Sequence, residues 1–401
     1  QNLDQFGISA KDISFDIKKI VQRSRSVARS LNQGISHLLK KNKVTVFDGT
    51  GAIHGKDSVS VTDSEANIKI IRADHIILAT GARAKTLPGM EPEGKRIWTY
   101  REAMVPEEVP KSLLVVGSGA IGMEFASFYS DLGVDVTIVE VLDRILPVED
   151  AEISGLALKS FEAQGMTIHT GTKVNSLEAG PNDVAAELEI EGVSQSLSFD
   201  RAIVAIGIVG NVENIGLDST NIVVEKNHIV VNEWLETGEP GIFAIGDLVG
   251  PPWLAHKASH EGVICVEHIA GLDTRPLDVS SIPGCTYCRP QIASVGLTEA
   301  DAIERGFEVS VGRFPFLANG KAIALGDTEG QVKTVLDTKT GELLGAHMIG
   351  PEVTEMIQGY VVARSSEATE AEIMHAVFPH PTLSEAMHEA VLDTVDRAIH
   401  F

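Results

Sequence analysis

The 401-residue sequence predicts an α/β fold that is followed by a C-terminal α+β domain. Three observations support this prediction. Residues 112–140 read in the order strand, glycine turn, helix and strand. Apolar strands end in a glycine at three separate places, in the segments HIILATG, AIVAIG and GIFAIGD. From Pro283 onward the segments GRFPFLA, QVKTVLD and ELLGAHMIG read as strands, and helices then continue to Phe401.

Composition and charge narrow the class of protein. Apolar residues make up 43% and charged residues 22%, which is typical of a globular chain with several domains. The net charge of −23 argues against nucleic acid or an anionic membrane as a partner, because both bind basic patches. No apolar run reaches the roughly 20 residues that span a bilayer, and the opening QNLDQFGISAKD does not resemble a signal peptide. With only three cysteines, we expect a soluble protein of a reducing compartment.

The chain is predicted to begin with one long amphipathic helix. Apolar residues recur at helical spacing from residue 13 to about residue 41, with basic residues between them. The segment VTVFDG predicts a strand, and the short alternating segments GAIHG and SVSV follow it. An apolar strand over residues 74–79 then ends in Thr80, Gly81 and Ala82. Such an ending allows a ligand to approach the backbone at the edge of a parallel sheet.

The most specific motif is GSGAIG at residues 117–122, which follows the apolar strand LLVV and opens a helix that ends near Gly133. A second strand, VDVTIV, delivers Glu140 at about the distance of 20 residues that a dinucleotide fingerprint requires. Gly117 allows the tight turn, Gly119 lets a pyrophosphate approach the backbone, and Gly122 lets the helix pack on the strand. Glu140 would accept hydrogen bonds from the ribose hydroxyls and repel a 2′-phosphate. We therefore predict a Rossmann-like domain that binds NAD in preference to NADP.

The segment GIFAIGDLVGPPWLAHKASHEG is predicted to bind an anion. Asp247 closes an apolar strand, and a helix should begin near Trp253 or Leu254. The N-terminus of that helix favours negative charge, and a reduced flavin is such an anion. His256 and His260 have the i, i+4 spacing of metal ligands, but no third ligand is evident. A metal site is therefore not expected.

Two further motifs carry reactive side chains. Cys285 and Cys288 have C-x-x-C spacing, but the strand-like run QIASVGL follows them in place of a helix, which favours a structural role. His380 lies between two prolines in VFPHPTLSE, so its backbone has few alternatives. Glu385 fits either a capping box with Thr382 or a carboxylate that orients His380. On this segment alone the cap is the commoner arrangement.

Taken in order, HIILATGA, GSGAIG with Glu140, GIFAIGD and HPTLSE resemble segments of the flavin-dependent pyridine nucleotide-disulfide oxidoreductases, most closely the dihydrolipoamide dehydrogenases among them. The resemblance covers the whole chain. It implies an enzyme that reoxidises the protein-bound dihydrolipoyl groups of 2-oxo acid dehydrogenase complexes, with electrons passing from a dithiol through FAD to NAD. It also implies that His380 takes the proton of the dithiol, that Glu385 orients His380, and that this histidine reaches the active site of the other subunit of a homodimer.

The resemblance further implies binding residues, partners and domain boundaries. The implied FAD contacts are Gly51, Thr80, Gly81, Ala82, Asp247, Trp253, Leu254, Ala255 and His256. The implied NAD contacts are Gly117, Ser118, Gly119, Ala120, Ile121, Gly122, Met123, Glu124, Glu140, Val174 and Gly207. Residues 1–83 would be the remainder of an FAD domain, 84–210 an NAD domain, 211–281 a return to the FAD side, and 282–401 a dimerisation domain. Expected partners are lipoyl domains and an acyltransferase core, in the cytoplasm or, for a eukaryotic source, the mitochondrial matrix.

One departure from the family is large. Its members begin with an FAD-binding G-x-G-x-x-G and a redox-active C-x-x-x-x-C pair, and the 401 residues contain neither ahead of GSGAIG. The chain thus resembles a member without its N-terminal segment, and we expect these 401 residues alone to be inactive toward lipoyl substrates. Two alternatives stay open. One is a transhydrogenase-like flavoprotein, and the other is a noncatalytic dimeric fragment that keeps NAD affinity and docks on an acyltransferase complex.

Overall fold

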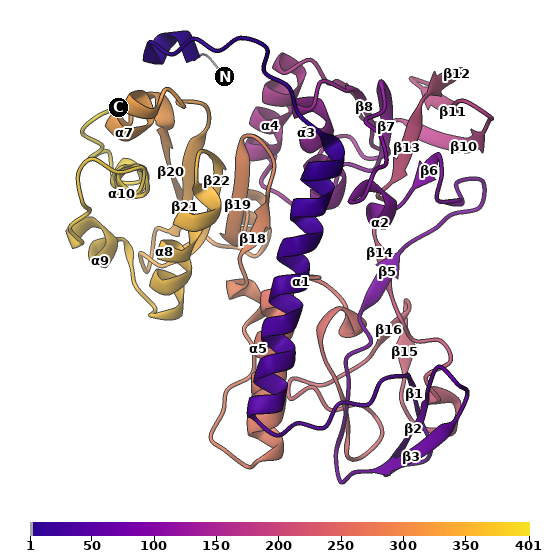
Figure 1. Ribbon diagram of the computed structural model, residues 1–401. Coiled ribbons are helices and arrows are strands. Elements are labelled where there is room, and N and C mark those ends of the chain that lie inside the picture. Colours follow the sequence, from indigo (N-terminus) through magenta and orange to yellow (C-terminus); the bar gives the residue numbers. More distant parts are fainter. Residues whose placement is uncertain (1–2) are drawn as a thin grey trace.

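The computed structural model describes residues 3–401, and its most prominent element is a single long helix, α1 (Ile17–Lys41) (Figure 1). The predicted long amphipathic helix is confirmed. It begins at Ile17, later than residue 13, because the Asp16 carboxylate accepts hydrogen bonds from the N–H groups of Lys18 and Lys19 and caps the helix there. A short 3-10 turn, Leu3–Phe6, precedes it. None of the side chains of α1 is buried, so its apolar stripe faces outward.

The strand predicted over VTVFDG is wrong. Residues 44–49 form no strand, because no neighbouring strand pairs with them, and Val44, Val46 and Phe47 are exposed. The first strand begins at Thr50 instead. It belongs to a three-stranded antiparallel sheet made of β1 (Thr50–Ile53), β2 (Ser58–Thr62) and β3 (Ile68–Arg72).

Residues 76–84 and 208–244 contribute only short strands. β4 (Ile76–Leu78) pairs in parallel with β17 (Ile242–Ala244), which brings the two predicted glycine endings HIILATG and GIFAIGD side by side. A 3-10 turn, Gly246–Val249, and a loop lead from β17 to α5 (Ala255–Ile269), which starts next to the predicted Leu254. Two small antiparallel pairs complete this part: β5 (Ala82–Ala84) with β14 (Ile208–Gly210), and β15 (Val224–Glu225) with β16 (His228–Ile229).

The middle of the chain forms a five-stranded parallel sheet, and the predicted strand, turn, helix and strand are confirmed in it. Its strands lie in the order β6 (Ile97–Trp98), β13 (Arg201–Val204), β7 (Ser112–Val116), β8 (Asp135–Val139) and β9 (Thr167–His169). The helices of this region are α2 (Tyr100–Ala103), α3 (Ala120–Asp131) and α4 (Ala151–Ala163). A three-stranded antiparallel meander is made of β10 (Lys173–Ala179), β11 (Val184–Ile190) and β12 (Val193–Phe199).

The C-terminal region is a five-stranded antiparallel sheet with helices, as the alternating pattern predicts. The strand order is β18 (Gly284–Thr286), β19 (Gln291–Gly296), β22 (Leu343–Gly350), β21 (Gln331–Asp337) and β20 (Val309–Pro315). Its helices are α6 (Glu299–Glu304), α7 (Gly320–Leu325), α8 (Val353–Ser365), α9 (Glu370–His375) and α10 (Glu385–Asp393). The architecture is thus Rossmann-like α/β with a C-terminal α+β domain.

The C-terminal sheet packs on different neighbours with its two faces. Ile292 and Ile349, paired across β19 and β22, share a hydrophobic core with residues of α3 and α4 (Figure 1). Ala293 and Met348, one residue along each strand, belong to a second core that includes residues of α8 and α10. Because neighbouring residues of a strand point to opposite faces, the sheet is apolar on both sides. The five-stranded parallel sheet and the C-terminal sheet therefore share one continuous core.

A buried ion network lies in the same interface. The Nζ atom of Lys333 on β21 lies 2.9 Å from an Asp150 carboxylate oxygen, 3.2 Å from Glu152 and 2.8 Å from Glu299. The Lys333 and Asp150 side chains are each only 3% exposed. Asp150 also caps α4 by accepting a hydrogen bond from the Glu152 N–H group. Lys333, from the C-terminal sheet, is therefore fixed at the start of α4.

Among residues 3–401, no helix combines the length and the apolar character needed to cross a membrane.

Candidate functional site

The GSGAIG turn has the geometry of a dinucleotide site. Gly117 has φ +98°, and a Cβ atom on it would lie 2.5 Å from the Ala205 carbonyl oxygen. A Cβ atom on Gly122 would overlap the carbonyl oxygen of Gly117, whereas one on Gly119 would meet nothing within 4 Å. Gly119 is also the N-cap of α3 and leaves the first N–H groups of the helix without a side-chain cap. Two of the glycines therefore serve packing, and the third leaves open space at the helix N-terminus for an anion.

Glu140 is held over this turn by the chain itself. One of its carboxylate oxygens accepts hydrogen bonds from the N–H group and the hydroxyl of Ser118, at 2.9 and 2.7 Å, and the other accepts from the N–H group of Leu142 at 3.0 Å. Residue Val141, which follows, is exposed. Glu140 is thus oriented at the carboxyl ends of β7 and β8, beside the uncapped start of α3.

The other residues expected near NAD fall into two groups. Gly207 follows β13, which pairs with β7, so it lies at the same edge of the sheet as Gly117. By contrast, the side chains of Met123 and Val174 are buried in two hydrophobic cores. The Glu124 carboxylate points to the C-terminal domain, where it accepts a hydrogen bond from the Tyr287 N–H group at 2.9 Å. Burial raises the pKa of Glu124, although this hydrogen bond works in the opposite direction.

The residues expected near FAD meet at the ends of β4 and β17. Thr80–Ala82 follows β4, and Asp247 follows β17, so both segments lie at the carboxyl edge of one parallel pair. Thr80 donates a hydrogen bond to the carbonyl oxygen of Asn211 at 2.8 Å, and Gly81 has φ +70°. The N-terminus of α5 has no side-chain cap, so its first N–H groups are free. Gly51, in contrast, lies in β1 of the separate three-stranded sheet.

These features fit part of a flavin site. Two strand ends, a glycine in the left-handed region and an uncapped helix of 15 residues offer backbone N–H groups to an anionic ligand. Trp253, just ahead of α5, donates its indole N–H to Nε2 of His228 at 3.2 Å. The ring of His256 hydrogen-bonds to the Pro283 carbonyl oxygen at 2.8 Å. Among residues 3–401, no cluster of three or more His, Cys, Asp or Glu side chains is arranged to hold a metal ion.

His380 and Glu385 form a hydrogen-bonded pair. The His380 Nδ1 atom lies 3.0 Å from Glu385 Oε1, while Oε2 of Glu385 accepts a hydrogen bond from the Thr382 N–H group at 2.8 Å. The contact between Glu385 and His380 is thus present, whereas the capping box is only half formed, because α10 begins at Glu385 and the Thr382 hydroxyl donates to the Pro379 carbonyl oxygen. Burial acts to raise the pKa of Glu385, but the Thr382 amide and the His380 ring outweigh it and hold that pKa below its usual range. Because Nδ1 faces a carboxylate, the neutral ring carries its proton on Nδ1, and the Nε2 lone pair points away from Glu385.

The His380 pair does not lie with the other site residues. Its imidazole is 77% exposed, and it lies between α9 and α10. These helices cover the face of the C-terminal sheet that points away from α3 and α4 (Figure 1). Within one chain, therefore, three sites lie apart from one another: the GSGAIG turn, the edge formed by β4 and β17, and His380.

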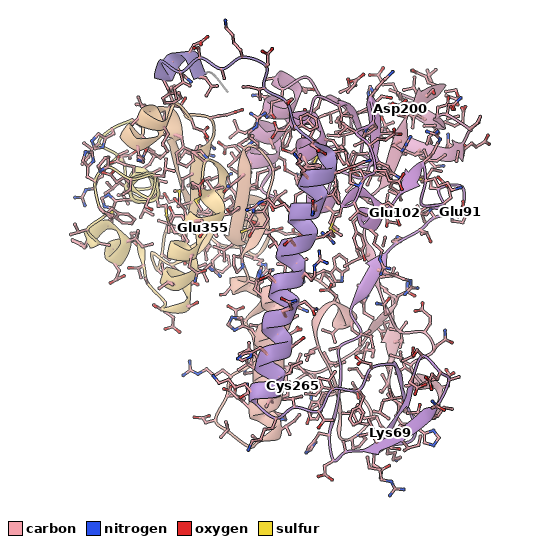
Figure 2. The ribbon with its side chains drawn as sticks, in the orientation of Figure 1. Lys69, Glu91, Glu102, Asp200, Cys265 and Glu355 are labelled. Atoms are coloured by element: carbon pink, nitrogen blue, oxygen red, sulfur yellow. The ribbon has the colours of Figure 1, made fainter. Side chains whose placement is uncertain are left out.

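The three cysteines are free thiols. Cys265 lies buried on α5 (Figure 2), and burial raises its pKa to about 11. Burial raises the pKa of Cys288 to about 12, and its Sγ atom lies 3.1 Å from the Pro290 carbonyl oxygen. Burial also raises the pKa of Cys285, and the carboxylates of Glu149 and Glu355 add to that effect. None of these thiols has the low pKa of a redox-active cysteine.

The structure adds residues that sequence reasoning missed. Tyr287 and Arg289 dock on α3 through Glu124, Ser127 and Asp131, which share one face of that helix. Lys257 and Glu261 form a buried ion pair on α5. The i, i+4 spacing of Lys257 and Glu261 was the only sign of their pairing, and it gives no indication of burial.

Two family models match the chain. The model of the pyridine nucleotide-disulphide oxidoreductase family matches residues 6–262, and the model of its dimerisation domain matches residues 282–391. The chain is 53% identical to the dihydrolipoyl dehydrogenase of Zymomonas mobilis, over 100% of this chain and 86% of that protein. It is 44% identical to the Bacillus subtilis dihydrolipoyl dehydrogenase, over 99% of this chain and 86% of that protein.

Solved structures are similar in the same way. The crystal structure of LpdA from Mycobacterium tuberculosis aligns with a TM-score of 0.89 and 27% identity, over 94% of this chain and 83% of that one. The HOCl-induced flavoprotein disulfide reductase RclA from Escherichia coli aligns with a TM-score of 0.86 and 26% identity, over 94% of this chain and 86% of that one.

Proposed function

Because the chain belongs to the pyridine nucleotide-disulphide oxidoreductase family and is a homologue of dihydrolipoyl dehydrogenases, we propose that it serves to reoxidise protein-bound dihydrolipoyl groups and to pass their electrons to NAD. The observation that carries this proposal is the pair formed by His380 and Glu385. Glu385 fixes the proton on Nδ1, so the exposed Nε2 is available to a substrate thiol.

The reaction requires such a base. Oxidation of a dithiol to a disulfide releases two electrons and two protons, whereas reduction of NAD takes up two electrons and one proton. His380 Nε2 accepts a thiol proton, and the Glu385 carboxylate stabilises the imidazolium that results. A bound flavin would supply the electron transfer between the disulfide and NAD.

The chain's own residues support this assignment of cofactors. The uncapped start of α3, open space at Gly119 and the oriented Glu140 carboxylate suit the pyrophosphate and ribose of NAD. Thr80–Ala82, Asp247 and the start of α5 would hold part of FAD. Glu140 favours NAD over NADP because its charge repels a 2′-phosphate.

We infer that two copies of the chain build the complete site. His380 lies apart from the β4–β17 edge of its own chain, and its exposure leaves it free to reach another molecule. The family's dimerisation domain covers residues 282–391 and includes His380. The partners we propose are a second copy of the chain and the lipoyl domains and acyltransferase core of a 2-oxo acid dehydrogenase complex.

We predict that a protein made of these 401 residues alone forms no NADH from dihydrolipoamide and NAD. The sequence contains no C-x-x-x-x-C pair, and burial raises the pKa of all three thiols. The measurement is NADH formation by purified chain of verified mass, together with an anaerobic visible spectrum before and after NADH. Dithiol-dependent NADH formation would contradict the prediction. A long-wavelength thiolate-to-flavin band in the spectrum would do so too.

We predict that Glu140→Gln weakens NADH binding by about tenfold and weakens NADPH binding less, or strengthens it. The amide oxygen can still accept from the N–H group and hydroxyl of Ser118, but the NH2 group cannot accept from the Leu142 N–H group. The change also removes the charge that repels a 2′-phosphate, and each lost charged hydrogen bond is worth about 1.5–3 kcal/mol. Titration of the 401-residue chain with each nucleotide, followed by quenching of protein fluorescence, measures both affinities.

The matched control is Glu178→Gln, which removes an exposed carboxylate from β10 in the same region of the chain. Neither affinity should change by more than about twofold in this control, since an exposed charge contributes little. An equal loss of NADH and NADPH affinity in Glu140→Gln would show that Glu140 only stabilises the turn.

A further inference from the structure

The ion pair between Lys257 and Glu261 is unusual for its burial. The two residues lie one turn apart on α5, and the Lys257 Nζ atom is 2.8 Å from a Glu261 carboxylate oxygen. Their side chains are 4% and 5% exposed. Removing two charges from water costs free energy that their mutual attraction often fails to recover, so such a pair is weak support for stability. Its presence at this place calls for another physical reason.

Both charged groups also form hydrogen bonds to one loop, residues 246–250. Lys257 Nζ donates to the carbonyl oxygens of Gly246 and Gly250, at 3.3 and 3.2 Å. The second carboxylate oxygen of Glu261 accepts from the Gly246 N–H group at 2.6 Å. The pair therefore ties both ends of the segment 246–250 to α5, and Asp247 lies between the two tied glycines.

The Leu248 side chain, in the middle of the segment, is buried in a hydrophobic core, but the backbone at the two ends of the segment has little other support. Gly246 and Gly250 have φ +73° and φ +104°, a region that side chains disfavour. The hydrogen bond within the segment, from the Gly250 N–H group to the Asp247 carbonyl oxygen, is 3.4 Å long and therefore weak. A Cβ atom on Gly246 would lie 3.3 Å from the Cβ atom of Ala258, so the loop rests directly on α5. Its conformation depends on the helix beneath it.

We propose that Lys257 and Glu261 are positioning residues for the flavin-side site: they hold Asp247 and the free N–H groups of α5 toward one ligand. The identity of that ligand as FAD rests on the proposed function. The expected consequence is that an apolar pair of similar size would keep the fold but release the loop, because two buried charges would be replaced without leaving either one alone.

The test compares two double variants of the 401-residue chain. Lys257→Met with Glu261→Leu removes the buried pair. Lys339→Met with Glu308→Leu removes an exposed pair, 3.1 Å apart, and serves as the matched control. Three quantities are measured for each: hydrogen exchange of the Gly246 amide, the Kd for FAD from flavin fluorescence, and the Kd for NADH. Should the apolar variant fail to fold, Lys257→Gln with Glu261→Gln takes its place.

In the buried-pair variant we expect exchange at Gly246 to be at least about tenfold faster and FAD binding about tenfold weaker, as for the loss of one charged hydrogen bond. NADH binding should change by less than about twofold, because its site is on another sheet. The conservative variant Lys257→Arg, with Glu261 intact, should keep part of the FAD affinity. Unchanged exchange and unchanged FAD affinity in a folded variant would overturn the proposal.

The two proposals can fail separately. If FAD binds neither to the unaltered chain nor to a protein that joins these 401 residues to an FAD-binding G-x-G-x-x-G segment, the assignment of the ligand is wrong, and exchange at Gly246 alone decides whether the pair positions the loop. If FAD binds and only the melting temperature falls in the variant, the pair is structural and the positioning role is wrong.

Discussion

Replacing His380 with glutamine is expected to lower the rate of dihydrolipoamide oxidation by about 10²- to 10⁴-fold, the usual contribution of a general base. Glutamine is similar in reach but cannot take up a proton from a thiol. The measurement requires a protein that contains these 401 residues together with a redox disulfide. In the same protein, electron transfer from NADH to a quinone should stay largely intact, because that reaction involves no dithiol.

A matched histidine provides the control. His375 is exposed at the end of α9, and its ring hydrogen-bonds to the Ala371 carbonyl oxygen without contacting a carboxylate. His375→Gln should leave both activities within about twofold of the starting protein, as expected for an exposed substitution. If His380→Gln lowered the quinone reaction as much as the dithiol reaction, His380 would not be the base that takes the thiol proton.

Replacing Lys333 with methionine is expected to lower the free energy of unfolding by about 3–5 kcal/mol. Methionine fills the space but leaves the buried Asp150 carboxylate without its cation. Arg313, which is nearby, does not replace that cation, because it already pairs with Glu152 and Glu299. Unfolding in urea, followed by circular dichroism, measures the change. Lys339→Met is the matched control, since its ion pair is exposed, and it should cost less than about 1 kcal/mol.

The cost of Lys333→Met should depend on pH. Burial acts to raise the pKa of Asp150, but the bond to Lys333 outweighs it, so that the net pKa is lowered. A lowered carboxyl pKa gives stability that is lost as the pH falls through it. Without Lys333, the Glu152 N–H group still acts to lower the pKa of Asp150, but the largest opposition to burial is gone and that pKa rises, so the variant loses less stability as the pH falls. The difference between the two proteins should shrink from pH 7 to about pH 4; a constant difference would contradict this account.

Local sequence patterns predicted the features that depend only on residues close together in the sequence. Two glycines of GSGAIG could be assigned because they meet a steric demand that recurs in such turns: Gly117 and Gly122 have no room for a Cβ atom. The prolines around His380 indicated a restricted backbone, but the segment alone favoured a cap, and only the family resemblance implied that Glu385 pairs with His380.

Contacts between distant segments could not be predicted. The register of β21 against β20 and β22 decides that Lys333 faces Asp150, and no local pattern encodes that register. The burial of Lys257 depends equally on the packing of the 246–250 loop. Strand propensity failed at VTVFDG for a related reason, since a strand needs a partner and residues 44–49 have none.

The core shared by the five-stranded parallel sheet and the C-terminal sheet has a consequence for protein engineering. Cys288, Ile292 and Ile349 pack into the same apolar cluster as Met123 and Phe161, and the Lys333 network crosses the same boundary. A boundary between the two regions can be drawn in the sequence, but their side chains pack into one core. A chimera that exchanges the five-stranded parallel sheet and its helices for those of a relative must therefore carry a matching face of the C-terminal sheet.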